Sequence, residues 1–249
     1  MLNKRIWEYR EPEANAEIPM MIVSPTIIND GRKLLIASQP ISYLSFLSPK
    51  NNVRNNHTTD AIEFSRFFKE QDADNLRFVT ALRMSATFPF IMPVAHLPSS
   101  PVIEVMDAGA RDNFGLEATI KFIYTFRNWI SANTSGIVII QIRDNEKRFQ
   151  VEENPKKTFL GELMSPVGSI YSNMFRTQDM NHDQLIQYFS ECFDGEIDVV
   201  DFELPTRKKG KKLSLSWHLT ASEKNQITSA FKLPNNQKSL ARLKLLMQE

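Results

Sequence analysis

An apolar run that ends in an acid and two very small residues constrains this chain more than any other feature. The run covers Val102–Met106, and Asp107-Ala108-Gly109 follows it directly. A helix signal comes next, because Asp112-Asn113 precedes apolar residues from Phe114 onward. In open α/β sheets, chemistry collects at the carboxyl ends of strands, which is where this acid would lie. Asp107 is therefore the first candidate site residue.

A second apolar run extends the pattern to a sheet. We expect a helix from Phe114 to about Ile130, followed by a strand over Ile137–Ile142. This strand is almost continuously apolar, as is typical of a central parallel strand. Strand, helix, strand makes a right-handed crossover, so Val102–Met106 and Ile137–Ile142 should be parallel neighbours. The sequence thus predicts an α/β fold with a mainly parallel central sheet.

The rest of the chain gives shorter signals. Asn29-Asp30-Gly31 predicts a two-residue turn between two strands, because Asp-Gly supplies the backbone angles that such a turn needs. Further helices are expected over residues 60–68, 76–86 and 183–192, from Thr220, and near the C-terminal end, with strands over 197–204 and 213–219. Residues 1–18 are polar and show no period, so we expect a connector there, and the whole chain, 1–249, is expected to form a single domain.

Composition excludes several classes of protein. The formal net charge of +1 gives no basis for nucleic-acid binding. The single cysteine, Cys192, rules out an internal disulfide and fits a reducing compartment. No apolar run approaches the ~18 residues that a membrane-spanning helix needs. We therefore expect a cytoplasmic protein. The basic run Arg207–Lys212 is best explained as a solvated turn, although such a run can also contact an anionic membrane surface.

Two motifs and a hairpin together resemble one protein family. Arg83–Pro89 reads Arg-Met-Ser-Ala-Thr-Phe-Pro, and Asp107–Asn113 reads Asp-Ala-Gly-Ala-Arg-Asp-Asn. This order is similar to the patatin-like phospholipases, which pair an Arg-x-Ser-Ala-x-x-Pro helix end with a downstream Asp-Gly-Gly or Asp-Gly-Ala motif and an Asn. Ile18–Ser38 is similar to the strand and hairpin that precede that helix in the family. The resemblance spans roughly Ile18 to Ile142.

The resemblance implies a three-layer α/β/α hydrolase domain, of which this chain is a part. The family hydrolyses lipid acyl esters with a Ser–Asp dyad and needs no cofactor and no metal. Asp107 matches the catalytic acid, which accepts the serine proton. Ala108, Gly109 and Asn113 match the supporting loop, where the Asn would cap the next helix or brace the acid. Ala108 departs from the usual first Gly, and Gly115 stands where a Pro is common.

The serine half of such a site is missing. The family nucleophile lies in Gly-x-Ser-x-Gly, preceded by a glycine-rich oxyanion loop. No two of the eight glycines here are adjacent or four positions apart, so neither element can occur. We therefore expect the C-terminal portion of a patatin-like catalytic region, truncated and inactive alone.

Three alternatives remain open. The chain is a non-catalytic remnant, or it is a subunit that completes a hydrolase in trans with a partner chain that carries the serine. A less favoured alternative is Mg²⁺-dependent phosphoryl transfer by Asp107 and Asp144, at the ends of neighbouring strands. At the level of the single residue, Asp107 could also be a turn or capping residue. The four histidines show no metal-ligand spacing and are expected to be surface or core residues.

Overall fold

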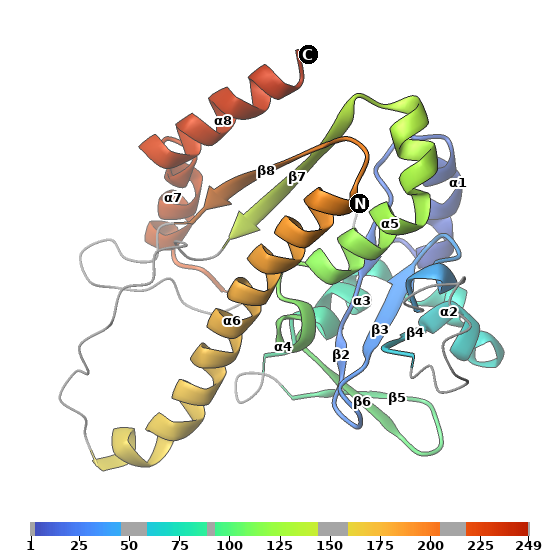
Figure 1. The fold of residues 1–249 in the computed structure, drawn as a ribbon. Coiled ribbons are helices and arrows are strands. Elements are labelled where there is room, and N and C mark those ends of the chain that lie inside the picture. The colour runs from blue at the N-terminus through green and yellow to red at the C-terminus, as the bar shows by residue number, and fades with distance from the viewer. Residues whose placement is uncertain (1–2, 46–58, 89–92, 144–158, 205–217, 249) are drawn as a thin grey trace. The chain divides into compact units, whose positions relative to one another are not determined.

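The computed structural model describes residues 3–45, 59–88, 93–143, 159–204 and 218–248, with side chains for all of them except 159–172. The chain divides into two compact units. The first contains residues 1–125 and 169–185, and the second contains residues 126–168 and 186–249. Each unit has a sheet of its own (Figure 1).

The first unit consists of short strands and short helices. Its strands are β1 (Ile22–Val23), β2 (Thr26–Ile27), β3 (Lys33–Ala37), β4 (Ala61–Glu63), β5 (Ala95–Leu97) and β6 (Ile103–Met106). Its α-helices are α1 (Arg10–Ala14), α2 (Phe64–Phe67), α3 (Phe78–Ser85) and α4 (Gly109–Asp112), with 3-10 turns at Ile6–Tyr9, Ser42–Ser45, Lys69–Gln71 and Ala73–Asn75. Two longer helices, α5 (Leu116–Asn133) and α6 (Phe159–Cys192), supply residues to both units.

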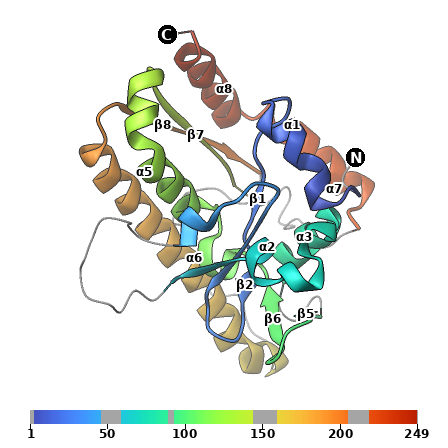
Figure 2. The same ribbon diagram turned by 90° about the vertical axis from the view of Figure 1, so that its right-hand side faces the viewer.

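The sheet of the first unit is mostly antiparallel. Its order is β1-β3-β2-β6-β5, and β4 lies beside β3 as the parallel pair (Figures 1 and 2). Strand β3 is buried along its whole length, with Leu34 and Ile36 in one apolar cluster and Leu35 and Ala37 in another. The core of this unit therefore lies on both faces of β3.

The predicted hairpin over residues 26–38 is confirmed, but its turn is longer than two residues. Strand β2 ends at Ile27 and β3 begins at Lys33. The amide of Gly31 donates to the carbonyl of Ile27 at 2.9 Å, and Gly31 has a φ of 76°. Gly31 thus supplies the left-handed backbone that lets the turn close.

The predicted parallel central sheet is wrong. Strand β6 pairs antiparallel with β2 and with β5, and β7 (Gly136–Arg143) pairs with β8 (Glu196–Glu203) in a separate sheet. The hairpin β2–β3 gives β6 an antiparallel neighbour, as Thr26 lies opposite Met106. The apolar run of β7 was misleading because Ile140 and Ile142 on it are exposed. The fold is mixed α/β, without a mainly parallel central sheet.

The second unit is built on the parallel pair β7–β8. The eight residues of each strand are in register, from Gly136 opposite Glu196 to Arg143 opposite Glu203. Helix α8 (Pro234–Leu246) packs against β8, and α7 (Ala221–Ala230) precedes it in the chain (Figure 2). The predicted capping box is confirmed: Thr220 and Glu223 exchange side-chain to backbone hydrogen bonds at the start of α7.

Several further expectations need correction. Residues 60–68 form β4 and α2 and not one helix, and residues 159–192 form the single helix α6, where the sequence indicated only its end. Ile6 and Tyr9, within the expected connector, are buried in the core of the first unit. Most of the strand expected over residues 213–219 lies outside the described residues. The division into two units does not decide whether the chain is one domain, and that stays a prediction.

Candidate functional site

Asp107 lies directly after β6, and residues of two other segments form hydrogen bonds with its backbone and with the amide of Ala108. Its amide donates to the carbonyl of Thr87 at 2.9 Å, and the next amide, of Ala108, donates to the carbonyl of Ser85 at 3.0 Å. The hydroxyl of Thr26 donates to the carbonyl of Asp107 at 2.9 Å. Thus β2, the C-terminal end of α3 and the end of β6 converge on one residue.

The carboxylate of Asp107 takes part in a local hydrogen bond. The amide of Gly109 donates to Oδ1 of Asp107 at 2.7 Å, and the Asp107 side chain is half-buried. This is the geometry of an acid that fixes a turn before the single-turn helix α4, as in the structural alternative. It also fixes the direction of the carboxylate, which a positioned base requires.

The two departures from the family pattern have simple backbone explanations. Ala108 has φ −61° and ψ −32°, an ordinary helical conformation for alanine, so its Cβ imposes no strain. Gly115 has a φ of 67°, a value that the ring of a proline cannot reach. A Pro at position 115 would therefore require a different path into α5.

Asn113 does not cap α5. The backbone amide of Asn113 donates to Oε1 of Gln178 at 3.1 Å. The carboxylate of Asp112 caps the helix instead, because it accepts from the backbone amides of Glu117 and Ala118 at 3.2 Å each. Asp112 is almost completely buried. Of the two roles expected for Asn113, capping is thus taken by Asp112, the other residue of the helix signal, and bracing of the acid loop stays a prediction.

Beside this cap lies a group of charged side chains that sequence analysis missed. Lys33 is 1 % exposed, and its Nζ lies 2.9 Å from Glu117 Oε2, 3.7 Å from Asp60 Oδ2 and 3.9 Å from Asp112 Oδ2. Lys121 pairs with Asp60 as well. The members come from β3, α4, α5 and the residue before β4, so no local pattern joins them. The sequence gives one indication of this charged group, which is Lys33 at the start of the otherwise apolar strand β3.

Helix α6 is the other contributor that the sequence did not indicate. Gln178 bonds to the loop that follows Asp107, and Nε2 of His182 lies 3.6 Å from Oδ1 of Asp112. His182 is buried, and its ring meets the ring of Phe114 edge-on at 6.2 Å. The histidines are expected to be surface or core residues, and His182 is a core residue.

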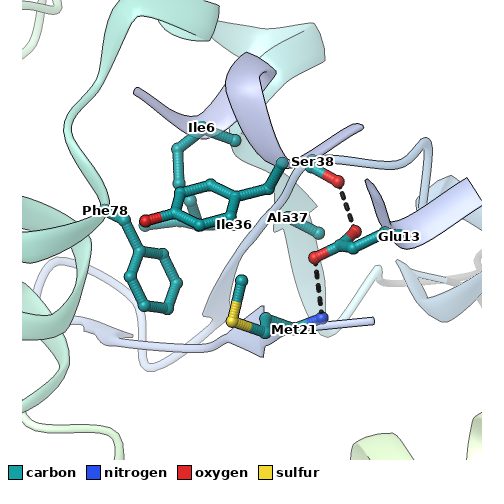
Figure 3. Close-up of a pocket in the computed structure, with 8 residues that line it drawn as sticks. Ile6, Glu13, Met21, Ile36, Ala37, Ser38 and Phe78 are labelled. Atoms are coloured by element: carbon teal, nitrogen blue, oxygen red, sulfur yellow. Dashed lines mark hydrogen bonds between the residues drawn. The ribbon is translucent and has the colours of Figure 1, made fainter. Parts of the chain in front are cut away.

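Asp107 lines neither of two hollows that the described residues form. The first, in Figure 3, is too narrow to admit a water molecule, and Glu13 in its wall accepts from the Met21 amide at 3.0 Å and from the Ser38 hydroxyl. This buried Ser–Glu pair has no room for a substrate. The second has a volume of about 320 Å³ and lies in the second unit, between Ile142 and Phe231.

The described residues were also compared with what a metal site and a membrane-spanning helix require. Among them, no three His, Cys, Asp or Glu side chains are grouped so that they could hold a metal ion. Asp144, part of the magnesium alternative, lies outside these residues. None of the helices in the described ranges combines the length and the apolar character needed to cross a membrane.

Comparison of the chain with models of protein families, with curated proteins and with solved structures found no match. The resemblance to patatin-like phospholipases therefore depends on residues of this chain alone.

Proposed function

We propose that this chain carries the acid half of a patatin-like lipid acyl hydrolase, with Asp107 as the acid of a Ser–Asp dyad. The substrate class is a lipid or other acyl ester. The serine is supplied by a partner chain, and without that partner the chain is inactive. The proposal concerns the chemistry of the Asp107 loop and makes no use of a parallel sheet.

One observation carries the proposal. The three sequence features behind the resemblance lie in separate segments of the chain, yet each forms a hydrogen bond with Asp107 or Ala108: the first two with the backbone and the third with the Asp107 carboxylate. The hairpin does so through Thr26, the Arg83–Pro89 motif through Ser85 and Thr87, and the Asp motif through its own Gly109 amide. A loop that serves only as a turn needs the last of these bonds and not the others.

The chemistry follows from a fixed carboxylate. The serine Oγ would attack the carbonyl carbon of the ester while its proton passes to Asp107. Collapse of the tetrahedral intermediate breaks the bond to the leaving alcohol, which takes that proton from Asp107. Water then attacks the acyl-serine while Asp107 accepts its proton. As the bond between the acyl carbon and the serine Oγ breaks, Asp107 returns that proton to Oγ and the acid product leaves.

The test is reconstitution. The chain is coexpressed with the product of the reading frame upstream of its gene, and hydrolysis of a nitrophenyl acyl ester is measured. We expect no hydrolysis by the chain alone, and hydrolysis by the pair that Asp107→Asn lowers by a factor of about 10² or more. Asp74→Asn is the matched control, because the half-buried Asp74 forms its ion pair, within the described residues, with the exposed side chain of Arg10.

The outcomes separate the alternatives. Activity of the pair that survives Asp107→Asn would refute the dyad, and activity of the chain alone would refute the missing serine. An inactive pair would favour the non-catalytic remnant. Magnesium-dependent phosphoryl transfer has lost its premise, since β6 and β7 are not neighbours in a sheet. The proposal places the enzyme in the cytoplasm. The basic run Arg207–Lys212, for which a solvated turn is favoured over contact with an anionic membrane surface, lies outside the described residues.

A further inference from the structure

One face of α6 lies against the loop that carries Asp107. Phe175, Gln178 and His182 are three and four residues apart, which places them on the same side of a helix. We call these three residues the α6 face. Each of them contacts the loop of residues 107–113, and all belong to the first unit.

Gln178 makes most of these contacts. Its Nε2 donates to the carbonyl of Gly109 at 3.0 Å and to the carbonyl of Ala110 at 3.2 Å. Its Oε1 accepts from the amide of Asn113 at 3.1 Å. A glutamine amide offers two donors and one accepting oxygen, so this side chain uses all of its groups on one short stretch of backbone.

The backbone that Gln178 holds is the one that orients Asp107. The Gly109 amide donates to Oδ1 of Asp107 at 2.7 Å, while the carbonyl of the same residue is bound by Gln178. A Cβ at Gly109 would lie 3.1 Å from the ring of Phe175, so the ring of the α6 face also closes on this residue.

His182 contacts the C-terminal end of the loop of residues 107–113. Its Nε2 lies 3.6 Å from Oδ1 of Asp112, whose carboxylate caps α5. Within the part of the chain that is described, its Nδ1 is buried and finds no hydrogen-bond partner. Among the described residues, the polar contact of this buried imidazole is the one with Asp112.

We propose that Gln178 is a positioning residue for Asp107. It acts through the backbone angles of Gly109: Gln178 holds the carbonyls of Gly109 and Ala110 on the C-terminal side of the Gly109 Cα, and this fixes the direction of the Gly109 amide on the other side, which donates to the Asp107 carboxylate. The inference rests on the proposed function, because a positioned carboxylate matters only if Asp107 does chemistry. Its structural part is testable without any catalytic activity.

The experiment uses the full chain labelled with ¹⁵N. The amide signal of Gly109 should follow the ionisation of Asp107, a response that Asp107→Asn removes. In Gln178→Met, which keeps the shape but no hydrogen bond, we expect this response to be lost and the Gly109 and Asn113 amides to exchange about tenfold faster. Gln184→Ala is the matched control, an exposed glutamine on the same helix, and should change neither.

A second variant separates positioning from general stability. Gln178→Glu keeps the oxygen that accepts from Asn113 but has no donor for the carbonyls of Gly109 and Ala110. It should protect Asn113 as in the wild type while the Gly109 response is still lost. It also serves in place of Gln178→Met if that variant does not fold.

A lower unfolding midpoint with an unchanged Gly109 response would overturn the inference, since Gln178 would then only pack α6 against the loop. If the Gly109 response is lost as expected but the reconstituted pair does not hydrolyse esters, the positioning stands and the proposed function fails. The two failures are therefore distinguishable.

Discussion

Gly109 lies where three side chains meet. A Cβ there would be 2.6 Å from Asn113 Oδ1, 2.7 Å from Asp107 Oδ1 and 3.1 Å from the ring of Phe175. Distances below 3.0 Å cannot be kept, so at least one neighbour has to shift. The backbone angles of Gly109 are not the reason for a glycine, because its φ is not positive. The small residue is needed for close approach.

We therefore predict that Gly109→Ala lowers the free energy of unfolding by about 1–3 kcal/mol, the cost of an overpacked site. Gly115→Ala is the control: its Cβ would meet nothing within 4 Å, and its cost comes only from a φ of 67°. Urea unfolding of both variants gives the comparison. A smaller loss for Gly109→Ala than for Gly115→Ala would contradict the close-approach explanation.

Glu117 gives a prediction about pH. Burial raises the pKa of its carboxyl group, but nearby Lys33 and Arg111 lower it by more, so the pKa lies below its ordinary 4.5. The folded state therefore binds fewer protons, and this stabilisation is present above 4.5 and is lost as the pH falls through the folded-state pKa.

Accordingly, Glu117→Gln should lower the urea midpoint near neutral pH, and the gap to the wild type should shrink as the pH falls below 4.5. Glu70→Gln, on an exposed residue, is the control and should change the urea midpoint near neutral pH very little. A Glu117→Gln gap that widens in acid would mean that Lys33 and Arg111 do not lower the pKa.

Residues were predicted from the sequence only where the interaction is local. The end of β6 at Asp107 and the small residues after it could be predicted from residues that are adjacent in the sequence. The burial of Lys33 among three acids could not, because Asp60 and Glu117 come from distant segments. The same is true of Gln178, which is 69 residues away from Gly109 in the chain.

Among elements, α8 shows how one side chain joins a helix to a sheet. Asn236 is 3 % exposed. Its Oδ1 accepts from the amide of Glu203 at 2.9 Å, and its Nδ2 donates to the carbonyls of Glu203 and Ala230, each at 2.8 Å. The residue thus connects the start of α8, the end of β8 and the end of α7.

We predict that Asn236→Ala lowers the free energy of unfolding by about 2–3 kcal/mol, because it removes the three hydrogen bonds that this buried side chain makes to the backbone. The neighbouring Asn235 is exposed, and Asn235→Ala should cost less than about 0.5 kcal/mol. Chemical unfolding of both variants measures the difference. Equal losses would show that the contacts of Asn236 add nothing beyond helix propensity.

Elements with a periodic pattern or a local cap were predicted well, and the pairing of strands was not. Helix α5 and strands β6, β7 and β8 lie close to their expected ranges. The partners of β6 are β2, from the hairpin β2–β3, and β5, and both pair with it antiparallel. Apolar content alone cannot distinguish β7, with Ile142 74 % exposed, from a strand buried on both faces.

On the scale of the whole molecule, the long helices α5 and α6 each contribute residues to both units. Residues 116–125 of α5 belong to the first unit and residues 126–133 to the second. Likewise, residues 169–185 of α6 belong to the first unit and both of its ends to the second. Melting one unit alone would have to break both helices in the middle, which loses their cooperative hydrogen bonding.

We therefore predict that both units unfold in one transition. Methyl signals of Val105 and Val200, buried at 0 % and 2 % exposure, report on the first and the second unit respectively, and their midpoints in urea should coincide. Lys33→Met removes a buried cation from beside Asp112 and Glu117 and should cost about 3–5 kcal/mol, and it should lower both midpoints although Lys33 belongs to the first unit. Lys69→Met, on an exposed lysine, should move neither. If Lys33→Met lowers the Val105 midpoint and leaves that of Val200 unchanged, the units are independent, and the prediction of a single domain over residues 1–249 is wrong.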